Sequence, residues 1–177
     1  MSGKYLNKEQ VKQQEQTRRT AMSATVKLAI VLVIIAVVLL NIFTHFIQVV
    51  NYRGSGMEPS LHNGEILVLQ KTQKVKEGDI IAFYYNNQVL VRRVISTGGK
   101  QLSIAQDGTV SVNGIVQEEK YLENLSLGQC NIDFPYHVRT GYVFVMGDNR
   151  ETAMDSRLKE IGLIPAGRII GKVIFTI

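Results

Sequence analysis

Three short stretches of this sequence hold side chains suited to covalent or acid–base chemistry. Residues 54–61 contain two serines directly after a long apolar run, Arg92 and Arg93 adjoin in an apolar segment, and residues 147–157 contain two aspartates and two arginines. A serine hydroxyl is a poor nucleophile unless a base removes its proton. Arginine stays protonated at physiological pH and cannot be that base. The arginines of these stretches therefore cannot activate either serine.

Other reactive residue types give weaker patterns. Asp148 and Asp155 have neither metal-ligand spacing nor an aspartic-protease context, so we expect no carboxylate dyad, no metal and no cofactor. His62 and His137 are far apart in the sequence and have no acidic partner in an obvious motif, so a Ser/His/Asp triad is not predicted. Cys130 is the only cysteine and can form no intrachain disulfide, so we interpret it as a packing residue.

Four stretches resemble the motifs of type I signal peptidases, which are serine/lysine peptidases. Residues 56–61 are similar to the nucleophile box Ser-Met-x-Pro-Thr/Ser-Leu, and residues 64–68 to the Gly-Asp-x-Ile/Val-Leu/Val strand that follows it. Residues 90–95 are similar to Ile-Lys-Arg-Val-Ile/Val, and residues 147–157 to Gly-Asp-Asn-Arg-x-x-Ser-x-Asp-Ser-Arg. The resemblance spans residues 28–177 and identifies the chain as a member of this family, of Gram-positive type.

The resemblance also assigns positions to the catalytic groups. In the family a serine is the nucleophile, a neutral lysine is its base, and a second serine orients the lysine. The aligned motifs place Gly56 at the nucleophile position, Arg92 at the lysine position and Ala153 at the orienting-serine position. Glycine forms no acyl intermediate, arginine stays charged, and alanine has no hydroxyl. The resemblance therefore implies a pseudoenzyme that has lost its serine/lysine dyad.

Other residues of the chain could replace the missing nucleophile and base. Ser55 is the fallback nucleophile, but on an extended segment its side chain points to the face opposite that of Gly56. A relocated base would have to come from lysines in polar, turn-rich segments, where a solvated charge is the usual state: Lys71, Lys74, Lys76 and Lys100. We therefore do not expect a relocated Ser/Lys pair.

The resemblance further implies roles for residues around the catalytic positions. The substrate cleft is expected at Met57, Pro59 and Ser60, with Ser60 also making a local structural hydrogen bond. Structural support is expected from three residues of the last motif: Asp148, Asp155 and Arg157. An Arg92 side chain in the old lysine pocket would need a carboxylate partner, because an unpaired buried charge is costly; Asp155 is the expected partner.

Positive charge is concentrated before the apolar run. The sequence has 20 Lys and Arg against 15 Asp and Glu, for a formal net charge of +5. Residues 1–27 hold six of these basic residues and two of the acidic ones, so the rest of the chain is nearly neutral. A nucleic-acid-binding domain would carry its basic residues on the folded part. The distribution therefore predicts a membrane topology and argues against a nucleic-acid partner.

Residues 24–50 are predicted to form one transmembrane helix. Residues 28–40 are apolar without interruption, and about 20 helical residues cross a bilayer core. A cleavable signal would have a shorter apolar core and a small-residue cleavage site after it. We therefore expect an uncleaved single-pass anchor in membrane lipid, with a cytoplasmic basic arm at 1–23 and an extracellular domain at 51–177. A buried core helix is the alternative.

The domain at 51–177 is predicted to be mainly β, an antiparallel domain of the signal-peptidase type. Short runs of β-branched and aromatic residues alternate with Gly, Asn and Asp, and Asn86-Asn87 predicts a two-residue hairpin turn. The expected strands are 65–70, 79–85, 88–96, 101–105, 109–112, 142–146 and 168–177. Residues 100–141 separate two of the motif stretches and are expected to form a small inserted β subdomain.

The leading functional hypothesis is a membrane-anchored signal peptidase I-like protein without proteolytic activity. Such a protein would still bind extended segments of secreted or surface proteins, because strand addition needs only main-chain hydrogen bonds. Non-catalytic members of the family accompany pilus or surface-protein assembly in some Gram-positive bacteria, which implies secreted precursors or pilin-like proteins as partners. One alternative is an active signal peptidase that processes signal peptides with displaced groups. Another is a non-catalytic structural partner.

Overall fold

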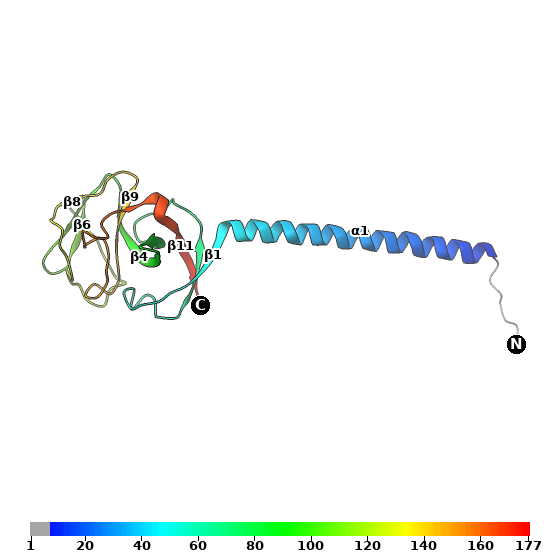
Figure 1. The fold of residues 1–177 in the computed structure, drawn as a ribbon, viewed down its shortest axis with the longest axis horizontal. Coiled ribbons are helices and arrows are strands. Elements are labelled where there is room, and N and C mark those ends of the chain that lie inside the picture. Colours follow the sequence, from blue (N-terminus) through cyan, green and yellow to red (C-terminus); the bar gives the residue numbers. More distant parts are fainter. Residues whose placement is uncertain (1–7) are drawn as a thin grey trace. The chain divides into compact units, whose positions relative to one another are not determined.

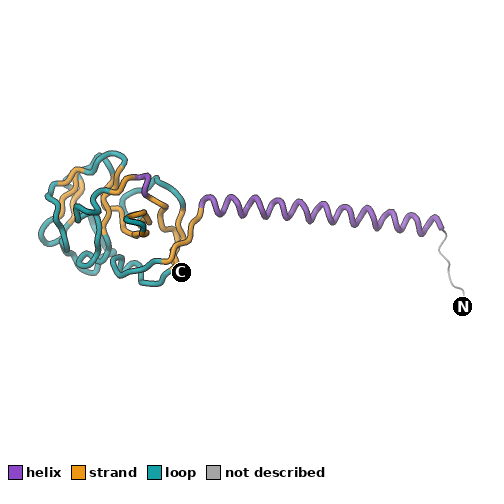
Figure 2. The backbone as a smooth tube through the Cα atoms, in the orientation of Figure 1, coloured by secondary structure: helices purple, strands orange, loops and turns teal. Residues whose placement is uncertain are grey.

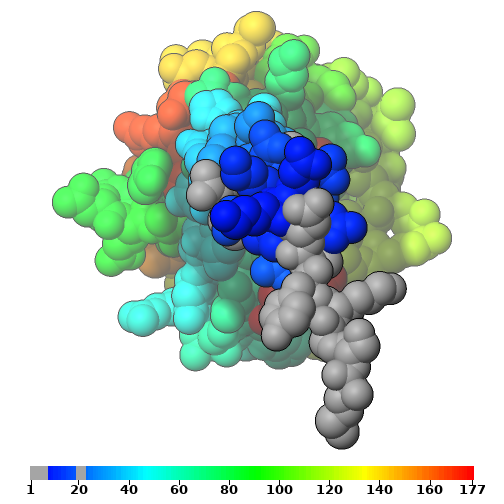
Figure 3. Space-filling view, turned by 90° about the vertical axis from the view of Figure 1, so that its right-hand side faces the viewer, coloured from blue at the N-terminus to red at the C-terminus, as the bar shows by residue number. Residues whose placement is uncertain are grey.

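The computed structural model describes residues 8–177, which divide into a helical unit up to His45 and a β unit from Phe46 to Ile177. The helical unit contains all but the last residue of α1 (Lys8–Phe46), which has 39 residues and is long and apolar enough to cross a membrane. Its described side chains are exposed, and those of its first turns are drawn in blue in Figure 3. Much of the predicted basic arm is thus helical.

Polar residues within the apolar part of α1 bond to the helix itself. Asn41 Nδ2 donates to Val37 O at 2.9 Å, and Thr44 Oγ1 donates to Leu40 O at 3.0 Å. Bonds of this kind satisfy polar side chains without water, as a membrane interior requires. The helix ends at Phe46, four residues before the predicted end at Val50, because the next residues pair as a β-strand.

The larger sheet is antiparallel and has seven strands in the order β1-β2-β11-β3-β4-β9-β10. The C-terminal strand β11, labelled in Figure 1, therefore lies between β2 and β3, which are far earlier in the chain. The seven strands of this sheet are β1 (Ile47–Asn51), β2 (Ile66–Gln70), β3 (Ile80–Tyr85), β4 (Gln88–Thr97), β9 (Tyr142–Met146), β10 (Ile164–Pro165) and β11 (Ile169–Thr176). A 3₁₀ turn, η1 (Ala166–Arg168), joins β10 to β11.

The smaller sheet has four strands in the order β7-β6-β5-β8. All of them lie within residues 100–141, between β4 and β9 in the chain, and they are short (orange in Figure 2). They are β5 (Gln101–Ile104), β6 (Val110–Val112), β7 (Ile115–Val116) and β8 (Tyr136–His137). Whether this segment is a subdomain of its own stays a prediction, since the β unit clusters as one body.

Turns join the strands where the sequence offers residues that tolerate positive φ. Asn86 and Asn87 have φ of 44° and 61° and connect β3 to β4, as the hairpin prediction required. The hairpin aligns β3 and β4 so that Arg92 lies opposite Ile81. On its other side β4 pairs with β9, and Arg93 lies opposite Met146, the last residue before the stretch 147–157. The two motif stretches are thus neighbours in space.

Candidate functional site

The loop between β1 and β2 is closed and anchored by its own residues. Tyr52 N donates to Glu65 O at 2.8 Å, and Gly64 N donates to Tyr52 O at 2.9 Å, so the two ends of the loop meet. Met57 is fully buried in the apolar cluster that also contains Leu61, and its backbone N–H donates to the Tyr52 hydroxyl at 3.0 Å. Main-chain hydrogen bonds and buried apolar side chains therefore both hold the loop in place.

The guanidinium of Arg92 lies directly against Gly56. A Cβ atom added to Gly56 would lie 3.2 Å from Nη2 and 3.3 Å from both Cζ and Nη1 of Arg92. Ordinary van der Waals contact of a Cβ begins at about 3.4 Å, so the guanidinium would have to shift by a few tenths of an ångström to admit a side chain at position 56. Arg92 itself is only 7% exposed. Residues from the loop and from β4 thus form one buried contact.

Arg92 bonds to main-chain carbonyls. Its Nε donates to Met154 O at 2.9 Å, and its Nη1 donates to Val91 O at 2.6 Å. Burial lowers the pKa of the Arg92 guanidinium, and the negative charge of Asp155 partly opposes that shift. The expected ion pair with Asp155 does not form, because Asp155 is occupied by Arg157. The side chain is thus buried, as the lysine-pocket hypothesis required, but with a different set of partners.

Ala153, in the stretch 147–157, lies close to the contact between Gly56 and Arg92. Ala153 is buried, and its N–H donates to Asn149 O at 3.0 Å. Asn149 N donates to Gly56 O at 3.2 Å. A Cβ added to Gly147 would lie 2.3 Å from both Ala153 Cβ and Gly56 O. The structure therefore brings together the three positions that the resemblance assigned to catalysis, with Gly147 packed between two of them.

The close packing of Gly147 gives a testable prediction. Gly147→Ala forces a Cβ into the backbone of Gly56 and the side chain of Ala153, and we expect it to lower the free energy of unfolding by about 1–3 kcal/mol. Thermal unfolding of the full chain, followed by near-ultraviolet circular dichroism, measures the effect. The matched control is Gly167→Ala, where nothing lies within 4 Å of the added Cβ. Equal unfolding temperatures for the two variants would contradict the packing argument.

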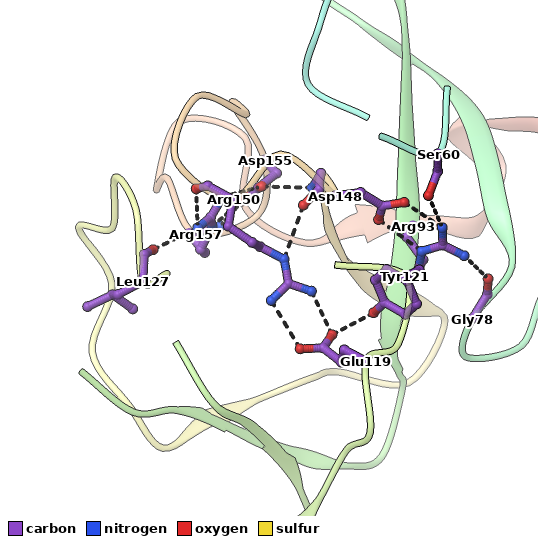
Figure 4. A network of polar contacts seen from close by, with 11 residues as sticks. Ser60, Gly78, Arg93, Glu119, Tyr121, Leu127, Asp148, Arg150, Asp155 and Arg157 are labelled. Atoms are coloured by element: carbon purple, nitrogen blue, oxygen red, sulfur yellow. Dashed lines mark hydrogen bonds and ion pairs between the residues drawn. The ribbon is translucent and has the colours of Figure 1, made fainter. Parts of the chain in front are cut away.

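A buried ion pair supports the stretch 147–157. Arg157 donates through Nε to Asp155 Oδ1 at 2.9 Å and through Nη2 to Asp155 Oδ2 at 2.8 Å, and both side chains are 0% exposed. Asp155 Oδ2 also accepts from Gly147 N at 3.0 Å. Arg157 Nη1 donates to the carbonyls of Leu127 and Arg150 (Figure 4). The pair therefore fixes both ends of this stretch and ties it to residue 127.

A second arginine connects this stretch to the loop that carries Gly56. Arg93 donates to Asp148 through Nε at 2.9 Å and through Nη2 at 2.5 Å. The same Nη2 donates to Ser60 Oγ at 3.1 Å, which gives Ser60 a structural bond. The Arg93 guanidinium also lies 3.9 Å from the centre of the Tyr121 ring. Arg93 thus joins β4, the 52–65 loop, and residues 121 and 148 (Figure 4).

The polar network includes two residues that no sequence pattern predicted. Glu119 accepts from Arg150 Nη1 at 3.1 Å and Nη2 at 2.6 Å, and from the Tyr121 hydroxyl at 2.5 Å. Burial, and then the Glu119 carboxylate, raise the pKa of Tyr121, so its hydroxyl remains a donor. Both residues come from the segment 100–141. A lone Glu or Tyr in a polar loop carries no local signal of a long-range contact.

Pro59 is exposed and borders a small polar cavity. The cavity has a volume of about 240 Å³ and is lined by Glu58, Pro59, Glu123, Asn124, Asp148, Asn149, Arg150 and Glu151. Of the three residues expected in the cleft, Pro59 alone borders this space, whereas Met57 anchors the loop from inside and Ser60 bonds to Arg93. Residues 8–177 contain no group of three or more His, Cys, Asp or Glu side chains placed to hold a metal ion.

The substitute nucleophile and bases lie away from a catalytic arrangement. Ser55 lies in a bend, not on an extended segment, and is exposed, and its hydroxyl bonds to no other residue of the described chain. No lysine in the described part of the chain is buried, and Lys100 Nζ bonds to Glu77 at 2.8 and 2.9 Å. His62 does have an acidic neighbour, Glu65, at 3.2 Å, but its side chain is 66% exposed.

Comparison with known proteins identifies the family. The family model described as "Signal peptidase, peptidase S26" matches residues 22–177. Signal peptidase I T of Bacillus subtilis (strain 168) is 35% identical over 153 residues, which cover 78% of each chain. Signal peptidase IB of Staphylococcus aureus (strain Mu50 / ATCC 700699) is 34% identical over 167 residues, or 82% of this chain and 86% of that one. A crystal structure of a signal peptidase I from Enterococcus faecalis V583 matches 56% of this chain and 96% of its own with 27% identity and a TM-score of 0.46. The chain belongs to the signal peptidase family, peptidase S26.

Proposed function

We propose that this chain is a membrane-anchored signal peptidase I-like protein that has lost proteolytic activity and binds extended segments of secreted or surface proteins. The observation that carries the proposal is the contact of the Arg92 guanidinium with Gly56. The position assigned to the nucleophile has no side chain, and the position assigned to the base is a permanent cation. An acyl-enzyme needs a nucleophile and a group that accepts its proton, and the residues at these two positions can be neither.

The surroundings offer no replacement for either group. A lysine becomes a neutral base at working pH only when burial or a neighbouring cation lowers its pKa, and all lysines described between residues 8 and 177 are exposed or half-buried. Ser55, the fallback nucleophile, bonds to no base within the described chain. Ala153 has a methyl side chain at the position where the family has the hydroxyl of the orienting serine. These observations favour a protein without proteolytic activity over an active peptidase with displaced catalytic groups.

Binding an extended segment does not depend on these lost groups. β1 is an edge strand of the larger sheet, and it leads directly into the loop that carries Gly56. An edge strand presents main-chain donors and acceptors to which an extended peptide can add. The exposed Pro59 and the polar cavity beside it provide further contact surface. A segment of a secreted protein therefore has a place to pair without being cut.

The proposed topology follows from charge and length. α1 is long and apolar enough to cross a membrane, and the basic residues of the arm precede its apolar part. Under the positive-inside rule the arm is cytoplasmic and the β unit faces the exterior of the cell. A client would then be a precursor or a pilin-like subunit during export, and the role would be that of an accessory in pilus or surface-protein assembly.

Cross-linking in the membrane tests this function. A photoreactive amino acid at Val49, which lies on β1 and is 60% exposed, is expected to capture a secreted precursor or a pilin-like subunit at its uncut length. The control carries the same group at Ile115, which is 69% exposed on β7 of the smaller sheet. Capture from both positions alike, or from neither, would contradict binding at the β1 edge and would favour a purely structural role.

A further inference from the structure

One end of the Arg92 guanidinium has no hydrogen-bond acceptor in the described chain. Its Nε and Nη1 each donate to a carbonyl, but Nη2 finds no acceptor among the described residues. Nη2 is not sealed inside the protein either, because the one fully buried side-chain N or O atom without a partner in the described chain is Glu65 Oε2. The residue as a whole is 93% removed from solvent, with 7% left exposed. The two N–H groups of Nη2 therefore have no acceptor in the described chain, and the atom is not fully enclosed by it.

A main-chain donor lies beside that end. The N–H of Gly56 has no acceptor in the described part of the chain, although its carbonyl accepts from Asn149. The next N–H, of Met57, is taken by the Tyr52 hydroxyl. Nη2 lies 3.2 Å from the Cβ position of Gly56, so the guanidinium end without an acceptor packs against the residue whose N–H also lacks one. Both offer hydrogens and neither offers a lone pair.

The charge of Arg92 is also uncompensated at short range. Within residues 8–177 it has no carboxylate at ion-pair distance, since Asp155 pairs with Arg157 and Asp148 pairs with Arg93. A buried cation without a carboxylate partner is costly, and a ligand that supplies the partner recovers that cost. Charge-assisted hydrogen bonds to carboxylates are also stronger than bonds to neutral carbonyls. The arrangement thus favours an anionic oxygen over a neutral one.

We infer that Arg92 Nη2 and the Gly56 N–H form a binding site for the carboxylate of an extended peptide. The inference rests on the proposed function, because it takes the peptide to be held along the β1 edge. One carboxylate oxygen accepts from the guanidinium and the backbone N–H together, in the position where a peptidase would hold reacting groups. Two sources share this chemistry: the terminal carboxylate of a chain that a peptide-bond hydrolysis has already cut, and an Asp or Glu side chain within the segment.

Binding of matched peptides to the full chain in detergent tests the site. The probes are a short peptide ending in Ala-Lys-Ala with a free carboxylate, the same peptide as its C-terminal amide, and an amidated version with one internal Glu. We expect the free acid or the internal-Glu peptide to bind about tenfold tighter than the plain amide, or more. Whichever acidic peptide gains the affinity identifies the source of the carboxylate.

Variants separate this site from the general positive charge of the chain. Arg92→Gln removes the charge and is expected to abolish the difference in affinity between the acidic peptide and its amide. Arg168→Gln removes an exposed arginine and is expected to keep that difference. Equal affinity of acid and amide for the unaltered chain would overturn the site while the proposed function stands. Failure of every peptide to bind would overturn both, and neither result depends on how well Arg92→Gln folds.

Discussion

A chain that carries Gly56→Ser, Arg92→Lys and Ala153→Ser together is expected to cleave a secretory precursor. The structure brings these three positions into one buried cluster, and the Asp155–Arg157 pair that supports them is in place. The substitutions supply a nucleophile, a desolvated lysine base and the hydroxyl that orients it. We expect a rate at least about 10³-fold above that of the unaltered chain, measured by release of the mature protein from the precursor.

The single substitution Gly56→Ser is expected to remain inactive. Its Cβ would contact the guanidinium at 3.2 Å, and the neighbouring cation takes no proton. The matched control for the triple variant is Gly56→Ala with Arg92→Lys and Ala153→Ser, which lacks only the nucleophile. Equal cleavage by the triple variant and this control would show that any activity comes from another group. No cleavage by the triple variant would contradict an intact cleft geometry.

Asp155→Ala is expected to cause the largest loss of stability. It leaves Arg157 fully buried without its carboxylate and removes the acceptor of the Gly147 N–H. Breaking a buried pair from one side costs about 3–5 kcal/mol, because the remaining charge is uncompensated. Thermal unfolding of the full chain by near-ultraviolet circular dichroism measures the change.

The control for this loss is an exposed pair. Glu118 and Lys120 lie 3.1 Å apart, with side chains that are 76% and 80% exposed, and Glu118→Ala is expected to leave the unfolding temperature unchanged. A small and equal effect of Asp155→Ala and Glu118→Ala would show that the buried pair does not hold the stretch 147–157 in place.

Local sequence patterns predicted the local structure well. The Asn86-Asn87 turn and the strands on either side follow from residues that tolerate positive φ between β-branched runs. The end of the helix was misplaced because Val49 and Val50 are apolar and suit either a membrane helix or a strand. Both residues pair with β2, and this pairing places them in a strand. That pairing is a tertiary contact, which periodicity does not encode.

The structure brings the three predicted catalytic positions together, but it gives Arg92 other partners than the predicted one. Gly56, Arg92 and Ala153 come from motifs far apart in the chain, and their meeting was implied by the family resemblance alone. Asp155 was expected to pair with Arg92, but Arg157 lies two residues away and reaches both carboxylate oxygens. A local, bidentate partner prevails over a distant one. Glu119 and Tyr121 enter through long-range packing, which no local pattern indicates.

The most direct test of the central claim is the unaltered chain itself, assayed for cleavage of a secretory precursor alongside Ser55→Ala. We expect no release of mature protein from either, because the nucleophile position is Gly56 and its neighbour is the Arg92 guanidinium. Cleavage by the unaltered chain that disappears in Ser55→Ala would contradict the account and would make this protein an active signal peptidase with a displaced serine.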